Sequence, residues 1–108
     1  MDVVERVYLL TQKFPKYELY GLANQMQRAA VSIRSNIAEG HTRAHSKEYL
    51  QHLSIARSSL AELETHLEIA ARLRYCSTEE LTDFLAQLDS LGRQLSTLRS
   101  VLVKNTNP

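Results

Sequence analysis

Histidine and carboxylate residues recur in this sequence at a spacing suited to metal binding. Three pairs lie four residues apart: Glu48 and His52, Glu62 and His66, and His41 and His45. Residues at this spacing share one face of a helix, and imidazole and carboxylate groups both ligate metals. A di-iron helical bundle needs Glu-x-x-His on two helices and a further Glu on two others. The observed spacing does not fit that pattern, so we predict no metal site and no cofactor.

The candidate nucleophiles lack the groups that would activate them. Four serines fall inside predicted helices without an evident base and third group: Ser32, Ser35, Ser58 and Ser59. The single cysteine, Cys76, has no neighbouring histidine in the sequence that would lower its pKa. The stretch AEGHTR contains one glycine and is not a glycine-rich phosphate loop. We therefore predict no catalytic residues and a protein that is not an enzyme.

Basic residues gather toward one polar loop, where nucleic-acid phosphates would be their natural ligands. Arg28 and Arg34 belong to a predicted helix, and Arg43 and Lys47 lie in the following stretch GHTRAHSK. If an oligomer presents this loop repeatedly, its positive charge becomes a ring that contacts phosphates. The alternative is an ordinary polar loop, because Tyr49 is the only aromatic residue nearby for base stacking. Both interpretations stay open.

Four amphipathic helices are predicted to position these residues. Apolar residues alternate at spacings of three and four along the four segments 3–14, 19–37, 49–70 and 84–102. The short loops between them force neighbouring helices to run antiparallel. The predicted fold is all-α: an up-down-up-down antiparallel four-helix bundle with a short first helix. A single domain spans residues 1–104, and residues 105–108 form a frayed tail.

Local residue types predict where these helices begin and end. Pro15 suits the first turn of the second helix, and Gly40 suits a left-handed residue at its end. Ser46 is predicted to cap the third helix. Ser77 and Glu80 form a capping box, in which each side chain accepts a hydrogen bond from the other's backbone amide. This capping box is the strongest boundary signal in the chain.

The first helix has about a dozen residues, against 20 or more in its partners. A bundle with one short helix leaves apolar surface uncovered at one end. We expect either that the chain has been shortened or that a partner subunit covers this end.

A second stripe of residues runs beside the apolar core seam. On the second and third helices its members are mostly small or uncharged: Gln25, Ser32, Asn36, Glu39, Ser59, Glu62 and His66. The corresponding stripe on the fourth helix consists of Gln87, Ser90, Gln94, Thr97 and Val101. A solvated face would carry more charge. The stripe indicates a subunit interface or a polar network that fixes helix register; a flank half-covered within the monomer is equally open.

Composition is that of an ordinary globular protein. The 108 residues include 44% hydrophobic ones, and 13 basic residues balance 12 acidic ones for a net charge of +1. This balance excludes a generally basic coat for nonspecific nucleic-acid binding. A single cysteine excludes an internal disulfide. The sequence has no apolar run of about 18 residues and no signal peptide, so we expect a cytoplasmic protein with no membrane partner.

The segment from Phe14 to Tyr75 resembles the 23S rRNA-intervening sequence protein family, also called four-helix bundle proteins. The resemblance rests on FPKYELYGLANQMQRAAVSIRSNIAEGHTR and on SLAELETHLE, which begins at Ser59. It implies a bundle that assembles into a ring, usually a pentamer, with no established catalytic residues. It also implies association with RNA or with another nucleic-acid-binding protein. The alternative hypothesis is a protein-binding scaffold or adaptor without a nucleic-acid role.

Overall fold

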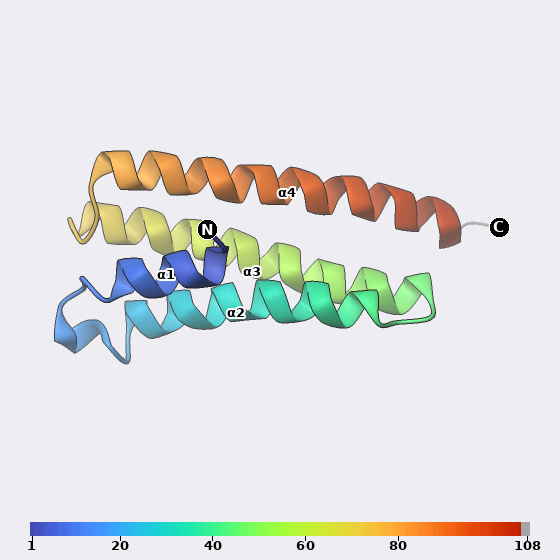
Figure 1. Cartoon of the computed structure of the whole chain (residues 1–108), viewed down its shortest axis with the longest axis horizontal. Helices are drawn as coiled ribbons and strands as arrows, with labels where there is room; N and C mark the ends of the chain where they lie inside the picture. Colours follow the sequence, from blue (N-terminus) through green and yellow to red (C-terminus); the bar gives the residue numbers. More distant parts are fainter. Residues whose placement is uncertain (107–108) are drawn as a thin grey trace.

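The computed structural model describes residues 1–106, which form four α-helices and one short 3-10 helix. In chain order they are α1 (Val3–Thr11), η1 (Lys16–Glu18), α2 (Leu22–His41), α3 (Ser46–Arg72) and α4 (Thr78–Thr106). Successive α-helices run in opposite directions (Figure 1). The predicted all-α, up-down-up-down bundle is therefore confirmed. Within residues 1–106, every helix is too short or too polar to cross a membrane.

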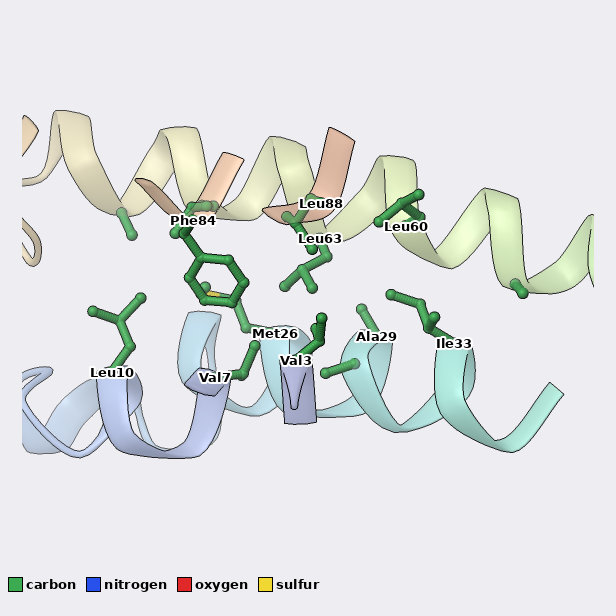
Figure 2. Packing of buried hydrophobic residues seen from close by; sticks show 14 of the residues in the cluster. Val3, Val7, Leu10, Met26, Ala29, Ile33, Leu60, Leu63, Phe84 and Leu88 are labelled. Atoms are coloured by element: carbon green, nitrogen blue, oxygen red, sulfur yellow. The ribbon is translucent and has the colours of Figure 1, made fainter. Parts of the chain in front are cut away.

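The core follows the predicted apolar seam. Its largest fully buried side chains come from all four α-helices and include Val7, Met26, Leu63, Phe84 and Leu88. Figure 2 shows these side chains pointing toward one another between the helices. Burying one such side chain contributes about 1.5–3 kcal/mol, so the shared seam is the main source of stability.

The length of α1 divides the bundle into two parts. With nine residues, α1 extends about 14 Å, against about 44 Å for the 29-residue α4. It packs beside α2 and α4 over one part of their length only (Figure 1). We call the part lined by α1 the covered half. The part lined by residues 33–41 of α2 and 90–106 of α4 is the open half.

The capping box at the start of α4 is confirmed. The Glu80 amide donates to Ser77 Oγ at 3.0 Å, and the Ser77 amide donates to Glu80 Oε1 at 3.0 Å. The predicted cap on α3 is wrong, because Ser46 is already the first residue of that helix. His45 occupies the capping position, and its side chain makes no capping bond.

The start of α2 differs from the prediction at Pro15. The residues after Pro15 form η1, and α2 begins only at Leu22. The physical reason is a side-chain cap, since Glu18 Oε1 accepts the Leu22 amide at 3.1 Å. Leu19, predicted to lie on the apolar seam, is exposed outside the helix.

Gly40 does not end α2 in a left-handed conformation, contrary to the prediction. It lies inside the last turn of the helix, and no glycine among the described residues has positive φ. A side chain there would place its Cβ 2.7 Å from Cδ1 of Tyr49 on α3. The glycine is needed because the two helices approach closely at this point.

The end of α4 lies beyond the predicted domain boundary at residue 104. The helix continues to Thr106, whose Oγ1 donates to the Val103 carbonyl at 2.8 Å. No glycine or proline lies between Lys104 and Pro108, so no helix-breaking residue stops α4 at the predicted position. The rest of the predicted tail, Asn107 and Pro108, lies outside the described residues.

Candidate functional site: the polar seam between α2 and α3

Four polar side chains form a hydrogen-bonded chain across the seam between α2 and α3. Ser59 Oγ donates to Ser32 Oγ at 2.8 Å. Asn36 Nδ2 donates to the Ser32 carbonyl at 2.9 Å, and Asn36 Oδ1 lies 2.9 Å from Nδ1 of His52. Because the Asn36 amide nitrogen donates to Ser32, its oxygen accepts, and His52 Nδ1 must carry the proton. We call these four residues the seam network.

Helix geometry explains why these residues meet. Ser32 and Asn36 are four apart on α2, while His52 and Ser59 are seven apart on α3. Both spacings keep side chains on one flank of a helix, and the two helices run antiparallel. Ser59 is buried, and the other three are half-buried, so water competes weakly for these bonds. The seam network therefore links α2 to α3 through hydrogen bonds at one register.

The remaining stripe residues lie on the outer side of the same seam. Gln25, Glu39 and Glu62 are exposed. His66 differs: its Nδ1 is buried and makes no hydrogen bond with any residue that the structure describes. Ile55 is also exposed on α3. The outer face of the seam thus combines charged, polar and apolar side chains.

The four predicted phosphate-contacting residues are all exposed but do not form one cluster. Arg43 and Lys47 flank the loop between α2 and α3, where Arg43 Nη2 pairs with Glu39 Oε2 at 2.8 Å. Arg28 lies about 20 Å along α2 from that loop. Arg34 lies near Asp2, with Nε 3.9 Å from the carboxylate oxygen. The loop end therefore presents two of the four cations.

A groove lies between α2 and α4 in the open half. The groove has a volume of about 490 Å³ and lies next to the first residues of α1. Its apolar lining includes Ile33 and Ile37 of α2 and Leu91 of α4. A neighbouring hollow of about 550 Å³ extends along α4 to Leu98 and Val101. The stripe predicted for α4 lines these hollows through Ser90, Gln94, Thr97 and Val101, while Gln87 reaches α1.

The metal-ligating residue types and Cys76 are the remaining candidates for chemistry. Residues 1–106 contain no group of three His, Cys, Asp or Glu side chains placed to hold a metal ion. Cys76 is buried, and this burial, with the nearby charge of Glu80, raises the pKa of its thiol. A thiol in this environment stays protonated at neutral pH and is a poor nucleophile.

Comparison with known proteins decides the family. The model of the family described as 23S rRNA-intervening sequence protein matches residues 1–97. The chain belongs to this family. Among curated proteins, no significant match was found.

The family match extends the resemblance seen in residues 14–75 to α1 and to most of α4. The seam network includes His52, a residue that the predicted stripe omitted. The signal was present, because His52 precedes Ser59 by seven residues and so lies on the same helix flank.

Proposed function

We propose that this protein is a non-enzymatic bundle that assembles into a ring-like homo-oligomer and associates with RNA. Five copies is the expected number, and the cytoplasm is the expected compartment. The observation that carries the proposal is membership of a family named for 23S rRNA. The chain contributes surfaces suited to both parts of this role.

The surface of the single chain supports assembly. Ile55 and Ile69 are exposed on α3, and Val101 on α4 is 51% exposed. These apolar side chains lie on or beside the predicted stripes, whose members are mostly uncharged. Contact with another copy would remove them from water, which favours association by roughly 25 cal/mol for each Å² of apolar surface buried.

The loop between α2 and α3 supports RNA association. Arg43, Lys47, His41 and His45 are all exposed at this end of the bundle. A ring would present the loop once per copy, and neighbouring cations would together displace counterions from an RNA backbone. The net charge of +1 per chain then understates the local field.

Native purification tests both parts of the proposal. Light scattering should give a mass near five times the chain mass of 12.3 kDa. Binding to a labelled RNA should weaken steeply as salt rises, because phosphate contacts release counterions. A monomeric mass contradicts the ring. Affinity that does not change with salt contradicts phosphate contacts.

A protein-binding scaffold is the second candidate, and the groove between α2 and α4 favours it. The groove has apolar walls at Ile33, Ile37 and Leu91, and the neighbouring hollow continues along α4 to Leu98, so the two together suit an elongated apolar segment such as a helix. Nuclease treatment separates the two candidates. A stoichiometric protein partner that survives RNA removal supports the scaffold, whereas loss of every partner supports RNA association.

A further inference from the structure

Two tyrosine rings project into solvent at the end of the bundle opposite the α2–α3 loop. Tyr20 is 89% exposed and Tyr17 is 78% exposed. Both belong to the segment between α1 and α2, which lies beside the α3–α4 turn (Figure 1). Aromatic side chains usually bury large areas, so two free rings in one short segment are unusual for a folded chain. Neither ring contributes much buried area to the hydrophobic core.

Hydrogen bonds hold this segment in place. Tyr17 Oη lies 3.1 Å from Tyr75 Oη, and Tyr75 Oη donates to Glu18 Oε2 at 2.8 Å. The Tyr75 ring in turn packs on buried Phe14, with 5.0 Å between ring centroids. Glu18 also caps α2 through the Leu22 amide. The Tyr17 ring is therefore anchored by its hydroxyl group while most of its surface stays in water.

Two cations lie in the same two segments. Lys16 and Arg74 are exposed, and neither makes an ion pair with any residue in the described part of the chain. Of the nearby carboxylates, Glu18 is bound by Tyr75, and Glu80 is paired with Lys13. Lys16 and Arg74 are thus available to an external anion.

Arg74 occupies a backbone position that favours glycine. Its φ is 64°, the only positive value among the described non-glycine residues. It follows the end of α3 in a closing turn where the Tyr75 amide donates to the Ala70 carbonyl at 2.9 Å. Glycine adopts this conformation without strain, so an arginine here sacrifices stability. A ligand that needs the guanidinium group would explain its presence.

We propose that Tyr17, Tyr20, Lys16 and Arg74 form a binding surface for single-stranded RNA, which we call the tyrosine end. This inference rests on the RNA association proposed above and locates its base-stacking contacts. Exposed rings stack on unpaired bases, and the two cations contact the flanking phosphates. A duplex hides its bases, so it would engage the cations alone.

The opposite end of the bundle lacks such a platform. Tyr49, the aromatic residue nearest the α2–α3 loop, is half-buried, and its Oη lies 3.0 Å from Nδ1 of His41. That loop has exposed cations and two exposed histidines but no exposed tyrosine. Stacking of bases on tyrosine would therefore be confined to the tyrosine end, while both ends would contact phosphates.

Fluorescence anisotropy with a short labelled single-stranded RNA, and with the matching duplex, tests this inference. The variant Tyr17→Ala/Tyr20→Ala should bind the single strand about tenfold more weakly and leave the duplex nearly unaffected. Replacing both residues with Phe should preserve binding, because the rings remain. Tyr8→Ala, at an exposed position on α1, is the matched control. The chain has five Tyr and no Trp, so quenching of tyrosine emission reports stacking directly.

Arg74→Gly gives a second readout in which stability and binding move in opposite directions. The melting temperature should rise, while the slope of log affinity against log salt should fall by about 0.7 for the lost phosphate contact. A purely structural role for Arg74 predicts a change in melting temperature alone, which would overturn its assignment to the surface.

The remaining outcomes separate this inference from the proposed function. If the native chain binds no single-stranded RNA, both fail together. If the native chain binds single-stranded RNA but the alanine variant binds it equally well, only the assignment of RNA binding to the tyrosine end is wrong. If the alanine variant changes the oligomer mass and not the RNA affinity, the rings belong to a protein interface, and the inference is likewise overturned.

Discussion

The covered and open halves of the bundle are built from the same helices but differ in how completely they are packed. In the covered half, α1 forms the fourth wall, and Val7, Phe84 and Leu88 are almost fully buried. In the open half, Leu98 continues the same apolar spacing on α4 yet is only half-buried. Periodicity therefore determines which face of a helix turns inward. Leu95 and Leu102 of the open half are nonetheless buried, so the missing length of α1 exposes one flank of α4 rather than its whole inner face.

One leucine from each half of α4 gives the largest expected contrast. Leu88→Ala should lower the free energy of unfolding by about 2–5 kcal/mol, because it leaves a cavity in a closed core. Leu98→Ala should lower it by only about 1 kcal/mol, since the side chain is already partly hydrated. Urea unfolding at low protein concentration measures both.

Repeating the measurement at high protein concentration sharpens this comparison. If another copy covers the open half in solution, the decrease in the free energy of unfolding caused by Leu98→Ala should grow with protein concentration. The decrease caused by Leu88→Ala should not. Equal losses at the lowest concentration would contradict the difference in packing between the two halves.

The polar contacts between α1 and α4 should make the next largest contribution to stability in the covered half. Arg6 pairs with Asp83, donates to Gln87 Oε1 at 2.8 Å and lies 4.5 Å above the Phe84 ring centroid. Arg6→Ala should therefore lower stability by about 1–2 kcal/mol in urea unfolding. Arg93→Ala is the matched control, because its pair is fully on the surface and should contribute at most about 0.5 kcal/mol. Similar losses for the two variants would contradict a structural role for Arg6.

The open half has a polar counterpart in the seam network. Asn36→Ala removes the acceptor of His52 and both bonds to Ser32, so stability should fall by about 1 kcal/mol. Ser35→Ala, an exposed neighbour, is the control and should change little. Urea unfolding measures the stability of both variants. If the oligomer mass falls for Asn36→Ala while the single chain keeps its stability, the network serves assembly rather than helix register.

The helix faces were predictable from sequence because the apolar spacing is regular. Leu63, Leu67 and Leu88 lie at predicted core positions and are fully buried. The capping box was predictable for a similar reason, since Ser77 and Glu80 are local partners whose geometry depends on four residues only. Signals of this kind need no knowledge of the rest of the fold.

The positions that depend on distant contacts were not predictable. Gly40 matches a helix end in sequence, but its reason is Tyr49 on the next helix. Leu19 fits the apolar spacing. However, the Glu18 side chain caps α2 at the Leu22 amide, so the helix begins after Leu19 and leaves it exposed. The tyrosine end was missed for the same reason, because Tyr17 and Tyr75 are far apart in the sequence and meet only in the folded bundle.

The smallest expected effect depends on pH and concerns the ion pair between Lys13 and Glu80 at the covered half. Lys13 of the segment after α1, and then the Ser77 amide, hold the pKa of Glu80 below its usual value. A lowered folded-state pKa means that this stabilisation is present above the usual pKa of 4.5 and is lost as pH falls through the lowered value. Glu80→Gln should therefore lower stability by less than about 1 kcal/mol at neutral pH, and the difference should vanish in acid. Glu79→Gln, which removes a neighbouring exposed carboxylate and keeps the Lys13–Glu80 ion pair, is the control. A difference that persists unchanged in acid would mean that the capping bond to the Ser77 amide, and not the ion pair with Lys13, accounts for the lost stability.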